Sequence, residues 1–314
     1  MRASLNFLKL VYPPMSNQLG EWLFRDPGVR DFVKRSNFYM LAQRHEVLFE
    51  NYLVDEPTRQ FRFDLVCGGA SARGLSVDMG PLLGGFDDAY EVQAGERIFK
   101  LMNCQDMNGE PIYWATTDKL LYDFWRHKVA IRGHVDVLQF TRFELYYVGI
   151  SKKHDSFTRL FDSGHKSRLK ILSNEAQFTP TSRLTDEIYI FLFDVEDLGI
   201  KIVDDDDFSI PEALDKQKLV ADAEKAFISV LDCKYNEVKY RDYPSGSDGL
   251  ADEGLTRYAY LIDEDIPFLA PGTEIRGAHG LLDRRRDPDM ICIEGELVTL
   301  RRADAAVPDG ESDA

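Results

Sequence analysis

Alternating apolar and polar positions predict strands in the second half of the chain. Leu145 to Ile150 alternates, and Val135 to Phe140 is a second short β-rich run. Thr141 to Glu144 between them suits a hairpin loop. Glu187 to Val195 is apolar on both faces, a pattern typical of a central strand that is covered on both sides.

One helical pattern follows the strand at Leu145 to Ile150, and another follows the strand at Glu187 to Val195. Ser156 to Leu172 has a helical pattern with a break at Ser163-Gly164, and a second helix is predicted from about Glu212, after Pro211, to Leu231. The order strand, strand, helix, strand, helix predicts one sheet with helices packed against it.

The flanking regions have different patterns. In the first 134 residues, Phe38 to Tyr52 is compatible with a helix, Phe61 to Cys67 with a strand and Asp118 to His127 with a helix. After Arg257 the pattern is short strands separated by turn residues. We therefore expect an α+β protein with four parts: a mixed α/β N-terminal domain over residues 1–134, a central domain over 135–240, a β-rich subdomain over 241–302 and a disordered acidic tail over 303–314.

Composition supports a globular protein with a sizeable core. Of 314 residues, 44% are hydrophobic, and the longest apolar run, Ile188 to Phe193, is far shorter than the roughly 20 residues of a membrane span. The start of the chain lacks a signal-peptide pattern. The four cysteines form no CxxC pair, so we expect a reducing, cytoplasmic location and no membrane partner. The oligomeric state stays open.

The charge pattern leaves room for a local phosphate site. A net charge of −16 argues against nucleic-acid binding over the whole surface. Part of the acidic excess lies in Asp204 to Asp207 and in the tail, whereas residues 145–185 hold seven Lys or Arg against three acids. This basic stretch suits either a phosphate site or an ordinary solvated face.

Two residue types near the 145–150 strand suit phosphate chemistry. Alternation puts Tyr147 and Gly149 on one face and Tyr146 on the other, so Tyr147 would point out beside a glycine that leaves space. Arg159 follows in the first helix, with His165 and Arg168 beyond it, and a guanidinium matches phosphoryl oxygens. Taken singly, a strand tyrosine and a helix arginine are commonplace.

The late helix supplies a candidate metal ligand. The neighbours of Glu224 along its row are Val220, Ile228 and Leu231, all apolar. A carboxylate in a buried row is costly unless it is paired or binds a metal; alternatively, its tip reaches water at the margin of the row. Asn236, just past the helix, also suits a plain helix-terminating role.

The arrangement of these residues resembles the GIY-YIG nuclease family over residues 135–240. Tyr147-Val148-Gly149 matches the second signature tripeptide, Arg159 the helix arginine, Glu224 the metal-binding glutamate and Asn236 the trailing asparagine. His165 corresponds to a histidine found in some restriction-enzyme members. The first tripeptide, Gly-Ile-Tyr, is expected within Val135 to Phe140, where this chain has no tyrosine.

The resemblance implies a hydrolase that cleaves phosphodiester bonds in nucleic acid, with DNA expected ahead of RNA. Glu224 would bind Mg²⁺ (or Mn²⁺), Arg159 would hold the scissile phosphate, and Tyr147 would orient or deprotonate the attacking water. His165 would assist this chemistry. Residues expected to contact substrate are Gly149, Lys152, Lys166, Arg168 and Asn236.

A second hypothesis comes from the incomplete signature. The same fold without its first tyrosine could be a non-catalytic module that binds nucleic acid or a protein. Cleavage that depends on both Mg²⁺ and Glu224 distinguishes the two hypotheses.

Overall fold

The computed structural model describes residues 2–162, 164–201, 213–246, 248–280 and 286–303. Asp204 to Asp207 and residues 304–314 of the predicted tail lie outside these ranges. The described part is a mixed α+β protein, as expected, with one large sheet, two small sheets and short helices. Its helices include none that is long and apolar enough to cross a membrane.

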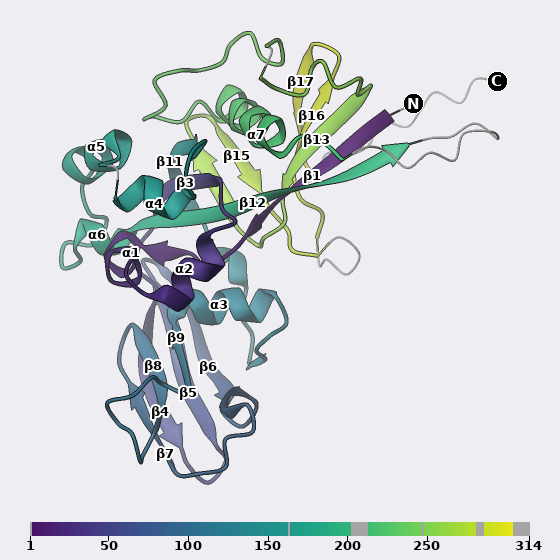
Figure 1. Ribbon diagram of the computed structural model, residues 1–314. Helices are drawn as coiled ribbons and strands as arrows, with labels where there is room; N and C mark the ends of the chain where they lie inside the picture. Colours follow the sequence, from purple (N-terminus) through teal and green to yellow (C-terminus); the bar gives the residue numbers. More distant parts are fainter. Residues whose placement is uncertain (1, 163, 202–212, 247, 281–285, 304–314) are drawn as a thin grey trace, which may run out of the picture.

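The large sheet contains ten strands and is curled and mixed (Figure 1). Its order is β15-β14-β11-β3-β12-β1-β13-β16-β17, with β2 paired to β12. The β1–β13 and β11–β14 pairs are parallel and the others antiparallel. The strands are β1 Arg2–Leu10, β2 Met15–Ser16, β3 Phe38–Gln43, β11 Phe143–Ile150, β12 Ile188–Lys201, β13 Arg257–Ile262, β14 Pro267–Ala270, β15 Thr273–Arg276, β16 Met290–Glu294 and β17 Leu297–Arg301.

This sheet draws strands from the first 43 residues, from 143–201 and from 257–301. The boundaries expected at 134/135 and 240/241 therefore do not separate one sheet from another. The predicted strands after Arg257 are present, and they extend both ends of the large sheet.

Residues 44–142 are inserted between the neighbouring strands β3 and β11, and most of them build a lobe beside the large sheet (Figure 1). The lobe holds one sheet of order β10-β6-β5-β4 and one of order β7-β8-β9. Its elements are β4 Leu48–Asp55, β5 Gln60–Cys67, β6 Ala70–Asp78, a 3-10 turn at Pro81–Leu83, β7 Tyr90–Ala94, β8 Ile98–Asn103, β9 Tyr113–Thr116, α3 Thr117–Trp125 and β10 Ile131–Arg132.

Two predictions around this insertion are wrong. The segment from Phe38 to Tyr52, predicted as a helix, instead contains β3 and β4. All six residues of β3 are buried, because other parts of the protein cover both faces of the sheet there. The strand predicted at Val135 to Phe140 contains a 3-10 turn at Val137–Gln139, begun by the Asp136 carboxylate that accepts from Leu138 N. The partner of β11 is consequently β3 and not this run.

The hairpin predicted with a loop at Thr141 to Glu144 is absent from this described part of the chain, because β11 pairs with β3 and β14. The helix predicted from about Glu212, which lies outside the described residues, begins at Lys216 and ends at Leu231 as expected. β11 and β12 contain the predicted strands, although β11 already starts at Phe143 within the predicted loop. The helices are α1 Asn17–Leu23, α2 Pro27–Val33, α4 Ser156–Phe161, α5 Lys166–Asn174, α6 Leu184–Glu187 and α7 Lys216–Leu231.

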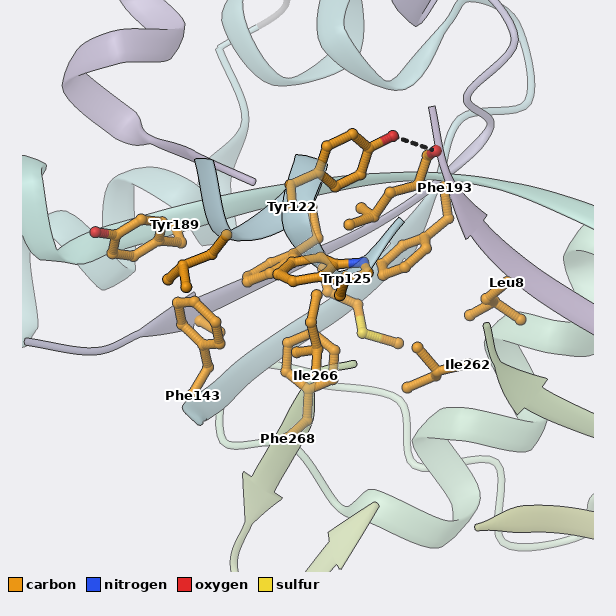
Figure 2. Packing of buried hydrophobic residues seen from close by; sticks show 14 of the residues in the cluster. Leu8, Tyr122, Trp125, Phe143, Tyr189, Phe193, Ile262, Ile266 and Phe268 are labelled. Atoms are coloured by element: carbon orange, nitrogen blue, oxygen red, sulfur yellow. Dashed lines mark hydrogen bonds between the residues drawn. The ribbon is translucent and has the colours of Figure 1, made fainter. Parts of the chain in front are cut away.

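Two apolar clusters cover the centre of the sheet. One contains side chains of α1, α2, α4 and α5 together with Leu41 and Ile190. The other contains side chains of α7, α3 and the inserted lobe, so lobe and sheet share one core. Figure 2 shows Trp125 of α3 among Phe143, Phe193 and Phe268 of the sheet.

Candidate active site

Two tyrosines lie together on the neighbouring strands β3 and β11. Tyr39 is paired with Gly149 in the antiparallel ladder, and its ring stacks on that of Tyr147 with centroids 6.0 Å apart and an interplanar angle of 28°. A Cβ at Gly149 would lie 2.5 Å from Cε1 of Tyr147 and 2.8 Å from the hydroxyl of Tyr39. The glycine therefore makes room for both phenols, as its position beside Tyr147 predicted.

His165 fixes the orientation of Tyr39. It is buried at the N-cap of α5, where Nδ1 accepts from Arg168 N at 3.0 Å. Burial, with the charges of Arg159 and Arg168, lowers its pKa to about 4, so the ring is neutral at neutral pH. The remaining proton must be on Nε2, which donates to the Tyr39 hydroxyl oxygen across 2.7 Å.

The hydroxyls of Tyr39 and Ser167 lie near the Tyr147 oxygen and favour its ionised form. Burial is the main reason that the pKa of Tyr147 is raised, and the charge of Glu224 acts in the same direction; the two hydroxyls and the charge of Arg159 oppose it. Tyr147 lines the cleft described below, so its phenol is available to a ligand bound there.

Glu224 is held by the free edge of β11. Beyond Glu144 the described part of the chain pairs no strand with this edge, and its polar groups bond elsewhere. Tyr146 O accepts from Tyr235 N at 3.0 Å, and the Ile150 N–H donates to the Glu224 carboxylate. Burial raises the pKa of Glu224 to about 7, opposed first by the charge of Lys152 and then by the Ile150 hydrogen bond.

Asn236 completes this edge. Its Oδ1 accepts from Val148 N at 3.0 Å and its Nδ2 donates to Val148 O at 2.7 Å. The side chain is buried, so both polar atoms serve to fix the end of α7 to β11. Asn236 therefore lines the cleft with its polar atoms already bonded to Val148, so it positions the neighbouring residues.

The basic residues divide into two groups. Arg168 is buried; its guanidinium donates to Asn17 Oδ1 at 2.6 Å and also pairs with Glu21, which ties α5 to α1. Arg159 is exposed on α4, and its side chain has no hydrogen-bond or ion-pair partner in the described ranges. Its charge still acts on Tyr39, Tyr147 and His165, so a free guanidinium lies near both phenols.

A cleft of about 240 Å³ brings together four of the nine predicted site residues, Tyr147, Lys166, Glu224 and Asn236, whereas Gly149, Arg159, His165 and Arg168 do not line it. Its walls come from β11, α5, α7 and the segment after α7, and they comprise Tyr147, Lys166, Ser167, Lys170, Glu224, Ile228, Tyr235, Asn236, Glu237, Val238 and Tyr240. Lys152 lies outside the lining, with its ammonium 3.7 Å from Asp248, but close enough to lower the pKa of Glu224.

Glu224 fits a single-carboxylate Mg²⁺ site. Its only bond partner among the described residues is a backbone N–H, which leaves lone pairs free. Within the same ranges no group of three or more His, Cys, Asp or Glu residues could enclose a metal. Mg²⁺ commonly uses one or two carboxylates and completes its shell with water and phosphate oxygens.

Tyr39 was missed by sequence reasoning, because Phe38 to Tyr52 was assigned to a helix. The available signal was length, since an apolar run of five residues, Phe38 to Ala42, between polar neighbours suits a buried strand. The predicted alternation also failed at Tyr146. A bulge between Leu145 and Tyr147 puts Tyr146 in the same apolar cluster as Tyr147.

Compared with protein-family models, with curated proteins and with solved structures, the chain matches none of them.

Proposed function

We propose that this protein is a metal-dependent nuclease of the GIY-YIG type, whose active site is the cleft between β11, α5 and α7. The observation that carries the proposal is the pair of stacked phenols over Gly149, with Glu224 in the same cleft as Tyr147 and the charge of Arg159 acting on both phenols. Tyr39 supplies the tyrosine that the sequence lacked at Val135 to Phe140. The inserted residues 44–142 separate it from Tyr147 along the chain, but the two rings are in contact.

The three side chains contact one another in the order His165, Tyr39, Tyr147. His165 donates to Tyr39, whose ring stacks on that of Tyr147 and whose hydroxyl lies near the Tyr147 oxygen. This leaves the Tyr147 hydroxyl as the group that orients the attacking water. Its raised pKa keeps the phenol protonated in the free protein, so proton uptake from water needs additional positive charge at the site.

Arg159 is the residue that would bind the scissile phosphate. An unpaired guanidinium can donate two parallel hydrogen bonds to phosphoryl oxygens and stabilise the charge that develops on them. Lys166 on α5 adds positive charge at the wall of the cleft.

Glu224 would hold Mg²⁺ or Mn²⁺ through its free lone pairs. When bound, the ion supplies stabilisation of the leaving oxygen. Because the pKa of Glu224 is about 7, metal binding displaces a proton below that pH and is favoured as pH rises through 7.

The test is a cleavage assay over DNA and RNA, single-stranded and duplex, with Mg²⁺, Mn²⁺ or EDTA. We expect divalent-ion-dependent cleavage that Glu224→Gln abolishes, because the amide keeps the shape but not the charge. The matched control is Glu196→Gln, an exposed carboxylate on β12 that pairs with Lys9 and does not line the cleft. Cleavage by Glu224→Gln at the parental rate would overturn the assignment. Nucleic-acid binding without cleavage of any substrate would favour the binding-module hypothesis.

A further inference from the structure

The segment after α7 is anchored at both ends and exposes its middle. Asn236 is clamped to Val148 at one end. At the other, Tyr243 is buried and its hydroxyl donates to Asp222 Oδ2 at 2.7 Å. Between these anchors Val238 is 60% exposed, so an apolar side chain faces solvent beside the cleft.

Tyr240 projects from this anchored segment to the candidate active site. Its backbone has a φ of +46°, a left-handed conformation that is disfavoured for residues with a Cβ. The ring is partly exposed and packs at the margin of the core. Burial raises the pKa of its hydroxyl to about 12, and the charges of Glu224 and Tyr147 contribute to that shift, so the ring lies close to both.

Tyr240 also separates two hollows. With Glu237 and Val238 it lines both the cleft of about 240 Å³ and a second hollow of about 720 Å³. The second hollow is lined by Arg241 too, which is exposed and has no side-chain partner in the described part of the protein. A strand leaving the cleft over Tyr240 would therefore meet another free guanidinium.

We infer that the substrate is an unpaired nucleotide strand, and that the base next to the scissile phosphate stacks on Tyr240. This inference rests on the proposed nuclease function. A phenol ring held by a rigid backbone gives a base a flat apolar surface at little entropic cost, and Val238 widens that surface. A base inside a duplex is stacked on its neighbours and cannot offer its face to the ring.

The charges fit such a strand. Lys166 and Lys170 stand on the α5 wall of the cleft, and Lys225, Lys239 and Arg241 line the hollow beyond Tyr240 together with the acids Glu237, Asp242 and Asp248. Of these cations Arg241 has no side-chain partner in the described part of the protein, so a phosphate on that side would meet it first. Lys170 is now paired with Glu237 at 2.6 Å across the cleft, in an exposed ion pair. Exposed pairs contribute little, and a phosphate can replace Glu237 as the partner of Lys170.

The experiment measures binding without a divalent ion, so that cleavage plays no part. A labelled oligonucleotide is titrated by fluorescence anisotropy as a single strand, as a duplex and as single strands that each lack one base. DNA and RNA versions identify the sugar. The proteins are the parent, Tyr240→Phe, Tyr240→Leu and, as a control, Tyr52→Leu on the inserted lobe, where Tyr52 is likewise partly exposed.

We expect the single strand to bind about 10-fold more tightly than the duplex, and Tyr240→Leu to lose about 10-fold in affinity for it. Tyr240→Phe keeps the ring and Tyr52→Leu is remote, so both should bind like the parent. One position in the abasic series should also lose affinity for the parent protein. This arm decides the matter if Tyr240→Leu fails to fold.

Any of three results would overturn the inference. These are equal affinities for the duplex and the single strand, a folded Tyr240→Leu with the affinity of the parent, and equal affinities for all strands of the abasic series. Its failure is distinguishable from failure of the proposed function. Glu224-dependent cleavage of paired and unpaired substrates at equal rates removes the inference alone. Tyr240-dependent binding without any cleavage removes the nuclease function and leaves the stacking surface.

Discussion

Tyr146 and Tyr147 are adjacent residues whose hydroxyls have different partners. The Tyr146 hydroxyl donates to Gln43 Oε1 at 2.8 Å in a buried position, whereas the Tyr147 phenol lies at the wall of the cleft with the hydroxyls of Tyr39 and Ser167 near its oxygen. The β-bulge gives both rings the same side of the sheet, so the hydroxyl partners distinguish them.

Tyr147→Phe should lower turnover by on the order of 10²-fold, the scale of a positioned acid–base group, while leaving the fold intact. Tyr146→Phe removes one buried hydrogen bond and should change stability but not chemistry. Single-turnover cleavage by the two variants makes the comparison. If turnover falls in Tyr146→Phe but not in Tyr147→Phe, the phenol that takes part in the reaction is Tyr146 and the proposed role of Tyr147 is wrong.

Arg159→Lys should lower the cleavage rate by on the order of 10²-fold, with a smaller loss of substrate affinity. Lysine keeps the charge but loses the planar pair of donors, and Arg159 has no other partner in the described ranges to mask the effect. Rates and affinities of both proteins are measured on the same oligonucleotide. Equal losses in the two quantities would mean that Arg159 only attracts polyanions.

Glu224→Gln should stabilise the metal-free protein at pH 8 and have little effect at pH 4. The folded-state pKa of about 7 lies above the usual value of 4.5, so the native state binds the proton more tightly. Stability contributed by the protonated carboxyl is then lost as pH rises from about 4.5 through 7, and glutamine does not titrate. The measurement is the melting temperature of both proteins from pH 4 to pH 8 in EDTA, and a constant difference over this range would contradict the assignment.

At the scale of elements, the sequence predicts those whose pattern is set locally. β12 is apolar on both faces and α7 has a long apolar stripe, so both were found. β3 was not predicted, because a short apolar run is compatible both with a buried strand and with a segment of a buried helix. β3 and β11 are separated by residues 44–142, and a local sequence pattern cannot predict that two strands so far apart in the chain pair with each other.

The site follows the same division. The sequence singles out Tyr147, Arg159 and Glu224 through their joint arrangement along the chain, and their catalytic roles stay predictions. Tyr39 and Tyr240 depend on tertiary placement, the first through the β3–β11 register and the second through a segment held by Asn236 and Tyr243. The roles of Asn236 and Arg168 likewise emerge only from their buried partners.

Asn236→Ala should separate the end of α7 from β11. It removes two hydrogen bonds and leaves Val148 N and O of the strand edge without partners. We expect a loss of about 1–3 kcal/mol in the free energy of unfolding, together with a lower turnover number, because Glu224 is carried by the same helix. Urea denaturation and cleavage kinetics measure the two effects. The neighbouring variant Glu237→Ala breaks only an exposed ion pair and should stay within about 1 kcal/mol of the parent; equal losses in both would argue against the clamp.

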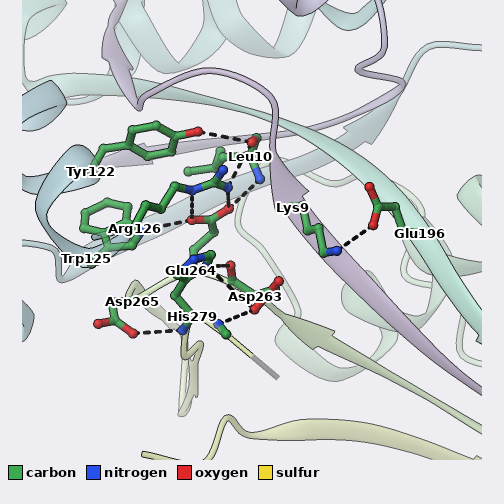
Figure 3. A network of polar contacts seen from close by, with 11 residues as sticks. Lys9, Leu10, Tyr122, Trp125, Arg126, Glu196, Asp263, Glu264, Asp265 and His279 are labelled. Atoms are coloured by element: carbon green, nitrogen blue, oxygen red, sulfur yellow. Dashed lines mark hydrogen bonds and ion pairs between the residues drawn. The ribbon is translucent and has the colours of Figure 1, made fainter. Parts of the chain in front are cut away.

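At the scale of the whole molecule, a buried ion pair joins the inserted lobe to the sheet. Glu264 is fully buried, and its carboxylate accepts from Leu10 N at 2.7 Å and from Trp125 Nε1 at 2.9 Å. It also pairs with the Arg126 guanidinium, which follows α3 (Figure 3). Since the lobe and the sheet also share one apolar cluster, we expect them to unfold together.

Glu264→Gln should lower the free energy of unfolding by about 3–5 kcal/mol, the usual cost of leaving one partner of a buried ion pair uncompensated. Far-UV circular dichroism follows the whole chain, while two of the three tryptophans, Trp114 and Trp125, report on the lobe. Both probes should give one coincident transition in the parent and in the variant, at a lower denaturant concentration in the latter. Glu196→Gln is the control, because it removes an exposed ion pair with Lys9 on the neighbouring strands and should change stability by less than about 1 kcal/mol. Two separate transitions in the parent would show that the lobe folds independently, and the β3–β11 pairing that forms the site would then not depend on it.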